Sequence, residues 1–277
     1  MSTTAIVQPA NFTRRSKSFA AKFAREGRYH FIPLYWLLRL SDFAREGMEH
    51  SGSYRFADHL YRGVPSGRGL LGRLLDAAVL KLPAARGMRQ RCFEARDAMC
   101  EAFAKHVGAE PFRILTVPCG LPRDVRDFCA GENARLDQIE YTGLDLDPAV
   151  IEAARAFLEG SAVPHPRWII GNALDAEAYP TPAPHFIAST GLGEFLDDPQ
   201  LAIFYANAFD ALAPGGTFFT SATARGASDV LLRAFELDTH YRTRADLERL
   251  LSRQLWKTLT FTHDATGLQT FVRATKG

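Results

Sequence analysis

Residues 114–125 read ILTVPCGLPRDV, and this stretch decides which fold the sequence predicts. An apolar strand runs into Cys119 and Gly120, with Pro118 and Pro122 on either side of that pair. A strand followed by a glycine turn and a helix usually holds a nucleotide, because the backbone can come close to the ligand at the glycine. The stretch therefore predicts a nucleotide site, although two prolines occupy places where glycines would be expected.

From Arg113 onward, stretches with strand character alternate with helical ones. The candidate strands cover residues 113–118, 140–145, 167–171, 185–190 and 217–222. The segments between them carry helix start signals, namely Asp147-Pro148, Asp198-Pro199 and the capping-box pair Thr243 and Asp246. Residues 255–275 read as two strands joined at a glycine-containing turn. The alternation predicts an α/β fold with a doubly wound, mostly parallel sheet covered by helices on both faces.

The first 110 residues show helical periods and few strand signals. One face of a helix closed by Gly108 is predicted to carry Met88, Cys92, Ala95, Met99, Phe103 and Val107. Residues 51–72, SGSYRFADHLYRGVPSGRGLLG, are dense in Gly, Ser, Tyr and Arg and poor in periodicity, which favours a functional loop. We expect an N-terminal helical cap over residues 1–110 and a sheet domain over residues 111–277.

The net charge of +2 hides an asymmetry along the chain. Residues 1–112 hold 18 Lys and Arg against 10 Asp and Glu, whereas residues 113–277 hold 15 against 21. A basic first third could meet nucleic acid, an anionic substrate or the acidic remainder of its own chain. The commoner interpretation is a solvated helical surface packed on an acidic neighbour.

Composition excludes several classes of protein. The chain is 47% hydrophobic and 23% charged, which is typical of a soluble globular protein. The longest apolar run, residues 31–38, is too short to span a bilayer, and the N-terminus does not resemble an export signal. We therefore expect a cytoplasmic protein without a membrane partner. No metal site is predicted, because CxxC pairs and zinc-like spacing are absent among the cysteines, which we read as reduced thiols: Cys92, Cys100, Cys119 and Cys129.

The residues that follow the predicted strands carry the chemistry, since a doubly wound sheet binds its ligand outside the carboxyl ends of the strands. Asp145 ends the second strand in GLDLD, where a carboxylate can accept hydrogen bonds from both hydroxyls of a ribose. The third strand ends in GNALD, where Asn172 offers an amide and Ala173 a backbone N–H to an adenine edge. Either Asp145 or Asn172 could instead cap a helix or a turn.

These stretches, in this order, resemble the class I S-adenosylmethionine-dependent methyltransferases. The resemblance covers roughly residues 112–275 and rests on four motifs in register: ILTVPCGLPRD, YTGLDLDPAVIEAAR, IIGNALD and LAPGGTFF. The family implies a Rossmann-like sheet of seven strands, the last of them antiparallel, and S-adenosylmethionine as cofactor. A similar sheet without this ligand is the alternative, and a nicotinamide dehydrogenase is disfavoured because GxGxxG is absent.

The same resemblance implies the parts of the cofactor site. Asp145 would hold the ribose, Asn172 the adenine, and Gly120 would let the backbone approach the methionine part. The residues that we expect at the cofactor are Pro118, Cys119, Gly120, Arg123, Asp145, Leu146, Asn172, Ala173, Leu174, Thr190 and Gly191. Of these, Thr190 and Gly191 would line the floor near the sulfonium.

The first motif departs from the family pattern at three positions. Thr116 stands where an acidic residue is usual, and Pro118 and Pro122 stand where glycines are usual. Since proline has no N–H, the turn offers fewer donors to the methionine carboxylate. Other groups must then hold part of the amino-acid end, and the candidates are Arg123, Tyr54, Arg55, His59, Tyr61 and Arg62.

Five residues are candidates for catalysis: Tyr54, His59, Tyr61, Glu194 and His240. Glu194, in STGLGEFLDD, could accept a proton or steer an amine, or simply cap the next helix. His240 could be a base near neutral pH or a lone surface histidine. Tyr54, Phe56 and Tyr61 could form an aromatic lid, which would stabilise the sulfonium by about 0.5–2 kcal/mol.

The leading hypothesis is a transferase that methylates a small molecule enclosed under the helical cap. The runner-up is aminocarboxypropyl chemistry, such as cyclisation of the cofactor's own chain to azetidine-2-carboxylate with release of methylthioadenosine. An RNA methyltransferase or RNA-binding module is disfavoured, because no Asn/Asp-Pro-Pro-aromatic signature follows the fourth strand. A binding-only regulator is a further alternative. The oligomeric state is open, and a homodimer is among the options.

Overall fold

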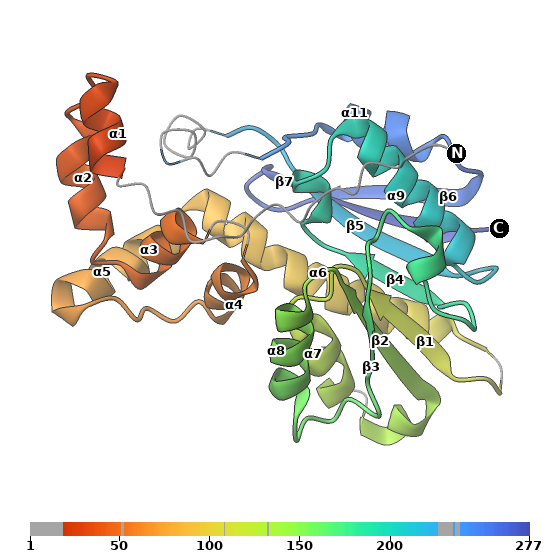
Figure 1. Cartoon of the computed structure of the whole chain (residues 1–277). Helices are drawn as coiled ribbons and strands as arrows, with labels where there is room; N and C mark the ends of the chain where they lie inside the picture. Colours follow the sequence, from red (N-terminus) through yellow and green to blue (C-terminus); the bar gives the residue numbers. More distant parts are fainter. Residues whose placement is uncertain (1–18, 51–52, 108, 132, 227–234, 236–238) are drawn as a thin grey trace. The chain divides into compact units, whose positions relative to one another are not determined.

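The computed structural model describes residues 19–50, 53–107, 109–131, 133–226, 235 and 239–277. The chain divides into two compact units (Figure 1). The helical unit holds the described residues up to Arg86 together with Phe235, and the sheet unit holds Gly87–Gly226 and Thr239–Gly277. The predicted boundary at residue 110 marks the place where strands begin, whereas the compact units divide the chain within a long helix, α6 (Pro83–Lys105).

The sheet unit contains a seven-stranded sheet of order β3-β2-β1-β4-β5-β7-β6. Neighbouring strands from β3 to β5 are parallel, and β7 runs antiparallel to both β5 and β6. The strands are β1 (Phe112–Thr116), β2 (Ile139–Asp145), β3 (Arg167–Ile170), β4 (Phe186–Ser189), β5 (Thr217–Thr223), β6 (Trp256–His263) and β7 (Gln269–Lys276). This confirms the predicted α/β, Rossmann-like sheet with an antiparallel last strand.

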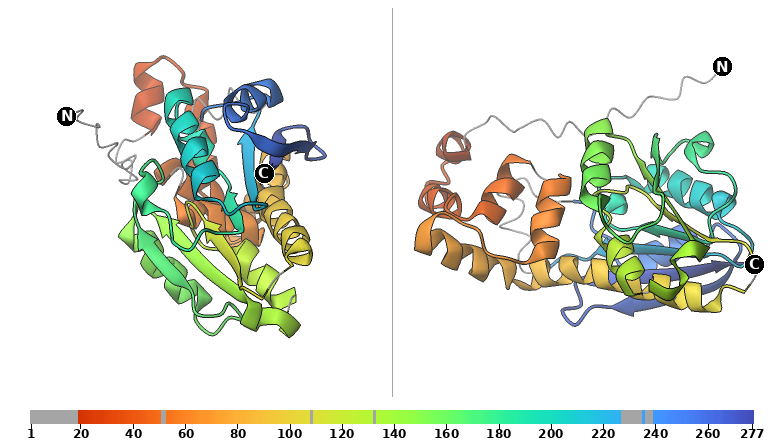
Figure 2. Two further views of the ribbon diagram at one scale, coloured as in Figure 1. Left: turned by 90° about the vertical axis from the view of Figure 1, so that its right-hand side faces the viewer. Right: turned by 90° about the horizontal axis from the view of Figure 1, so that it is seen from below.

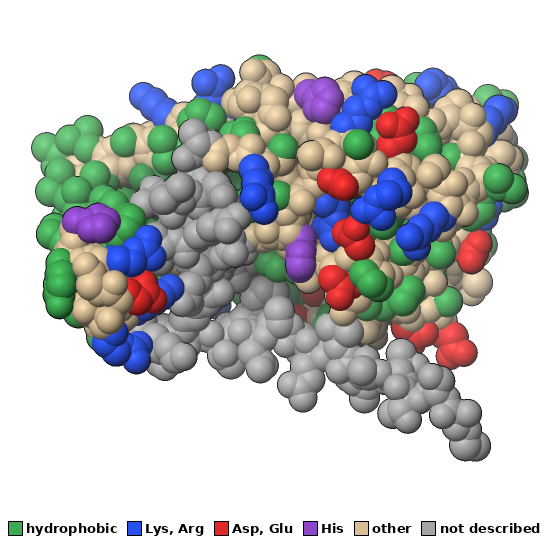
Figure 3. Space-filling model, turned by 90° about the horizontal axis from the view of Figure 1, so that it is seen from above, with side chains coloured by type: hydrophobic (Ala, Val, Ile, Leu, Met, Phe, Trp, Pro, Cys, Tyr) green, Lys and Arg blue, Asp and Glu red, His purple; other side chains and the backbone are tan. Residues whose placement is uncertain are grey.

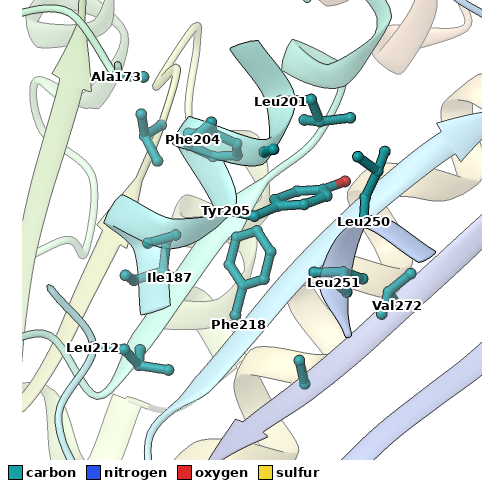
Figure 4. Close-up of a cluster of buried hydrophobic side chains, with 14 of the residues drawn as sticks. Ala173, Ile187, Leu201, Phe204, Tyr205, Leu212, Phe218, Leu250, Leu251 and Val272 are labelled. Carbon is teal, nitrogen blue, oxygen red and sulfur yellow. The ribbon is translucent and has the colours of Figure 1, made fainter. Parts of the chain in front are cut away.

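Helices cover both faces of the sheet (Figure 1, Figure 2). On one face, α9 (Asp198–Ala211) and α11 (Arg244–Leu251) bury Phe204, Tyr205 and Leu250 against Ile187 and Phe218 (Figure 4). On the other, α6, α7 (Arg123–Gly131) and α8 (Pro148–Leu158) contribute to a second core, which includes Ala95, Met99, Phe103, Phe128, Leu158, Phe112, Tyr141 and Phe219. Both core clusters are apolar, so the sheet is held by side-chain burial on each side.

The helix starts follow the predicted signals closely. The Asp147 carboxylate accepts the N–H of Ala149 at 2.8 Å, and Pro148 is the first residue of α8. The capping box of Thr243 and Asp246 opens α11 as predicted. The helix α9 begins one residue earlier than expected, because Asp197 rather than Asp198 is its N-cap and forms a capping box with Gln200.

The helical unit consists of short helices around an aromatic core. They are α1 (Phe19–Arg25), α2 (Phe31–Leu38), α3 (Asp42–Glu49), α4 (Tyr54–Arg62) and α5 (Gly69–Leu80). Phe19, Phe23, Tyr35, Met48 and Phe235 form its buried cluster. In the described part of the chain, no helix has the length and apolar character needed to cross a membrane.

The predicted loop over residues 51–72 was wrong, because most of it is helical. The hydroxyl of Ser53 caps α4 by accepting the N–H of Phe56 at 3.1 Å, and Gly63 ends the helix with a φ of +63°. The Phe56 ring stacks on Phe43 with centroids 4.8 Å apart. Two local caps bound this helix, and its buried side carries Phe56 and Leu60 at helical spacing, a period that the flanking Gly and Ser residues obscure in the sequence.

The long helix α6 carries most of the predicted buried stripe. Cys92, Ala95, Met99 and Phe103 are buried. Val107 is 94% exposed and lies beyond the end of the helix, so its place in the stripe was wrong. The predicted closing residue, Gly108, lies outside the described residues.

Candidate functional site

The segments that follow the central strands leave the sheet at one edge. In the parallel register, Thr116 of β1 lies between Gly143 of β2 and Ala188 of β4, and Asp145 at the end of β2 pairs with Ile170 of β3. Parallel strands end on the same side of the sheet, so the residues after β1, β2, β3 and β4 share one edge. This edge gathers the predicted cofactor-binding residues.

Asp145 joins the first two of these segments. Its carboxylate accepts the backbone N–H of Gly120, which follows β1, and that of Asp147, both at 3.2 Å. The side chain is buried, and this burial raises the pKa of Asp145, while the two hydrogen bonds partly oppose the rise. Asp147, not Asp145, caps α8. The hydrogen bond from Asp147 means that Asp145 does stabilise the turn after β2. The hydrogen bond from Gly120 connects Asp145 to the glycine turn after β1.

Gly120 supplies the backbone freedom that this turn needs. Its φ is +48°, a left-handed conformation that favours glycine, and a Cβ there would meet no atom within 4 Å. The neighbouring Cys119 is buried and donates its N–H to the carbonyl of Leu144 at 2.9 Å. Burial also raises the pKa of the Cys119 thiol, so this side chain is an uncharged wall of the turn and not a thiolate.

The segment after β3 forms a tight polar turn. The side-chain oxygen of Asn172 accepts the N–H of Leu174 at 3.0 Å, and the carbonyl of Ala173 accepts the hydroxyl of Tyr179 at 2.9 Å. The oxygen of Asn172 is therefore used within the turn, and its amide nitrogen is the atom that could donate to a base edge. Across the edge, the apolar Leu146 after β2 is 38% exposed.

The segment after β4 begins with Thr190 and Gly191 and continues into a short 3₁₀ helix, Leu192–Glu194. Glu194 is 5% exposed, forms an ion pair with Arg91 of α6 and accepts the hydroxyl of Thr223. Arg91 is itself buried and donates from Nε to Gln269 at 2.8 Å. Glu194 does not cap α9, since Asp197 does. A buried cation thus holds the carboxylate that was considered as a proton acceptor.

A second buried arginine, Arg242, also bonds to the segment after β4. Arg242 is 4% exposed and donates to the carbonyls of Gly193 and Leu196, the latter at 2.6 Å. Nearby, the backbone N–H of His240 donates to the carbonyl of Glu194 at 2.9 Å. The structure therefore brings His240, whose side chain is exposed, from the chain after β5 to the backbone of Glu194.

Two residues of the first motif contact other side chains of the sheet unit. The guanidinium of Arg123 lies over the Phe157 ring of α8 at 4.8 Å, beside Arg126, which stacks there at the same distance. Thr116, in the place of the usual acid, shares a hydrogen bond of 2.8 Å with the hydroxyl of Tyr141. Two buried hydroxyl groups therefore bond to each other at the position where the family usually has an acidic residue.

The remaining candidates, Tyr54, His59 and Tyr61, lie on α4 of the helical unit. His59 is buried, with its Nε2 3.4 Å from the carboxylate of Asp76. Asp76 also accepts the backbone N–H groups of Phe43 and Ser66 at 3.0 and 2.8 Å. Burial acts to raise the pKa of Asp76, but hydrogen bonds from Ser41, Ser66 and Phe43 outweigh it and hold the pKa below its usual range. This network ties three helices of the unit together.

Elsewhere on α4, Tyr54 accepts a hydrogen bond from Arg55 at 3.2 Å, and Arg62 pairs with Asp58 at 3.2 Å. The sequence did not predict Arg91, Thr223 and Gln269, which contact the segment after β4 or each other. One signal was available for Arg91, because it stands four residues before the buried Ala95 and so falls on the buried side of α6.

In the residues that the structure describes, no group of three or more His, Cys, Asp or Glu could hold a metal ion.

A family model described as "Putative methyltransferase" matches residues 38–249. The chain belongs to this methyltransferase family. Membership and fold together confirm the predicted resemblance to the class I S-adenosylmethionine-dependent methyltransferases and, with it, a transferase that uses this cofactor. A comparison with curated proteins gives no match.

Solved structures share the fold of this methyltransferase at low sequence identity. A "possible exported protein" from Bordetella parapertussis is 19% identical, with a TM-score of 0.76 over 94% of this chain and 97% of that one. An O-methyltransferase family protein from Burkholderia thailandensis is 12% identical, with a TM-score of 0.56 over 94% and 71%. Magnesium protoporphyrin IX methyltransferase from Synechocystis PCC 6803, solved with S-adenosylhomocysteine, is 8% identical, with a TM-score of 0.55 over 79% and 93%.

Proposed function

We propose that this methyltransferase transfers the methyl group of S-adenosylmethionine to a small molecule at the carboxyl edge of β1 to β4. The observation that carries the proposal is the buried carboxylate of Asp145, bonded to the N–H of Gly120 at 3.2 Å and standing next to the polar turn of Asn172. Such a carboxylate can accept both ribose hydroxyls while the turn meets the base. The bound S-adenosylhomocysteine of the Synechocystis enzyme, which shares this fold, supports it.

The nucleoside roles follow from position along the edge. Asp145 would hold the ribose, the amide nitrogen of Asn172 would donate to the adenine, and the exposed Leu146 would cover one face of the base. The open space at Gly120 supports close approach of the methionine chain to the backbone. Transfer then needs an aligned nucleophile about 3 Å from the methyl carbon and exclusion of water.

For the acceptor side we propose His240 as the proton-accepting group. Its side chain is exposed, and its backbone is fixed to Glu194. Glu194 is less suited to this role, because Arg91 and Thr223 already occupy its oxygens. The roles of Tyr54 and Tyr61 as catalytic or lid residues stay predictions. We also propose a cytoplasmic enzyme of small-molecule biosynthesis, which is supported by four free cysteines without a disulfide.

The test is incubation of the purified protein with S-adenosylmethionine that carries a deuterated methyl group, followed by mass spectrometry. With the cofactor alone we expect no turnover, and with a metabolite extract we expect labelled small molecules and S-adenosylhomocysteine. The matched control is Asp145→Asn, which should lose both products. Methylthioadenosine with a cyclic amino acid, formed without extract, would instead establish the aminocarboxypropyl chemistry. A protein that does not bind the cofactor would refute the proposal altogether.

A further inference from the structure

A buried polar cluster at the ligand edge has no part in the roles proposed above. Arg91, Glu194, Thr223 and Gln269 come from α6, the segment after β4, the end of β5 and the start of β7. The guanidinium of Arg91 bonds to all three partners, and Gln269 also donates to Thr223 at 2.9 Å. One side chain thereby joins four elements at the edge where β4 and β5 end.

Stability alone is a poor explanation for this cluster. Replacing a buried ion pair by apolar residues is often neutral or stabilising, because removing two charges from water costs about as much as their attraction returns. What the pair does provide is a defined position for the segment after β4. Gly191 has a φ of +95°, and a Cβ there would lie 3.4 Å from Nη1 of Arg91. The guanidinium therefore packs against the bend that starts this segment.

The neighbouring strand explains why that position matters. Thr116 of β1 pairs with Ala188 of β4. Pro118 and Thr190 each come two residues after this pair, so both follow the ends of neighbouring strands. Pro118 and Pro122 have no N–H, so the turn after β1 is short of donors for an amino-acid group. Backbone groups after β4, one of the two strands that pair with β1, could act as a substitute. To serve as one, the bend at Thr190 and Gly191 has to be rigid.

We propose that Arg91 and Glu194 are positioning residues, which hold the backbone of Thr190 and Gly191 where it receives the aminocarboxypropyl chain of S-adenosylmethionine. The inference rests on the proposed cofactor site and goes beyond it. It assigns the polar groups at the amino-acid end of the cofactor to the segment after β4, while the open space at Gly120 still admits the chain beside the turn after β1. Arg91 acts through the ion pair and does not touch the ligand.

The test compares two ligands that differ only in this chain. S-adenosylhomocysteine carries the amino-acid chain and methylthioadenosine does not, and both are measured by calorimetry. We expect Arg91→Lys and Glu194→Gln to weaken S-adenosylhomocysteine by about tenfold or more, because lysine cannot form the fork and glutamine cannot hold the cation. Methylthioadenosine should bind as it does to the unchanged protein. The matched control is Arg96→Lys, an exposed residue of α6 that pairs with Asp97.

Thr223→Val is a second variant in case the charged pair proves necessary for folding. It removes one hydroxyl from the cluster and leaves the two charges paired, and it should weaken only S-adenosylhomocysteine. Equal loss of both ligands, or no loss of either, would overturn the inference while leaving the nucleoside site in place. If the unchanged protein binds neither ligand, the proposed function itself fails, which is a separate result.

Discussion

Asp145 and Asp124 are two carboxyl groups that flank the same glycine turn, and they differ in what surrounds them. Asp145 accepts two backbone N–H groups, from Gly120 and Asp147. Asp124 lies in the first turn of α7 and accepts the N–H of Val125 at 3.0 Å. Burial raises both pKa values, that of Asp124 to about 6. Asp145 lies where a ligand could bind, whereas the ionised Asp124 lowers the free energy of unfolding at neutral pH.

We expect Asp145→Asn to weaken S-adenosylhomocysteine by at least about tenfold, since a hydrogen bond to a charged group contributes about 1.5–3 kcal/mol. The side chain keeps its size, so calorimetry would report the lost acceptor and not a cavity. Asp147→Asn is the control, because asparagine still caps α8 and the affinity should be unchanged. Equal losses in both variants would speak against Asp145 as the ribose ligand.

Asp124→Asn should stabilise the protein at pH 7 and not at pH 4. The raised pKa means that the folded state keeps a proton that the unfolded state has already lost, so stability falls as pH rises from about 4 to about 6. Asparagine avoids this loss, and because the residue is partly exposed we expect a gain of about 1–2 kcal/mol above pH 6. Urea unfolding across this range measures it, with Asp127→Asn on the same helix as the control. A gain that is constant with pH would contradict the expectation.

At the scale of elements, the strands could be predicted, whereas the helix α4 could not. Strands β1 and β4 are short, mostly apolar runs with a glycine soon after each, and nearly all of their residues are buried, which is typical of a strand covered on both faces. Helix α4 is amphipathic, with His59 and Leu60 on its buried side, but the flanking Gly and Ser residues obscure this period in the sequence. His59 is buried through a polar contact with Asp76 as well as against the Phe43 ring. A search for apolar periodicity does not detect a buried histidine whose partner is a carboxylate on α5.

Capping is the local signal that did predict helix starts, and α11 offers a clean test of its strength. Thr243→Ala removes an acceptor for the N–H of Asp246 at 3.3 Å and should destabilise the protein by about 1 kcal/mol. Thr243→Ser keeps the hydroxyl and should cost much less. Urea unfolding of both variants gives the difference directly. Equal destabilisation would mean that the methyl group of Thr243 matters and the cap does not.

At the scale of the whole molecule, the site divides into a part with local signals and a part without them. Asp145 and Asn172 could be predicted because Asp145 ends β2 and Asn172 comes two residues after β3, so their sequence positions alone place them at the edge. Arg91 and its partner Gln269 lie 178 residues apart and meet only after β7 has joined the sheet. Such a contact depends on topology and leaves no short motif.

The charge asymmetry also belongs to this scale, and the described ion pairs indicate how it is used. Basic side chains of the first third pair with nearby carboxylates, for example Arg45 with Asp42 at 2.6 Å and Arg39 with Glu49 at 3.3 Å. In the sheet unit, Arg273 pairs with Glu94 and Glu101 of α6. On the face in Figure 3, Lys and Arg lie among Asp and Glu and do not form a separate patch.

We therefore expect only weak, non-specific binding to RNA, with a Kd no tighter than the range of about 10⁻⁴–10⁻⁶ M. Interleaved carboxylates repel phosphates, and few counterions are released when scattered cations meet a nucleic acid. Fluorescence anisotropy with a labelled structured RNA measures the affinity between about 50 and 200 mM salt, where such binding should fall away. The matched measurement is S-adenosylhomocysteine, whose affinity should barely respond to salt, because its contacts are hydrogen bonds in a partly buried site. Tight RNA binding that persists at the higher salt would make a nucleic acid the acceptor and exclude the small-molecule proposal.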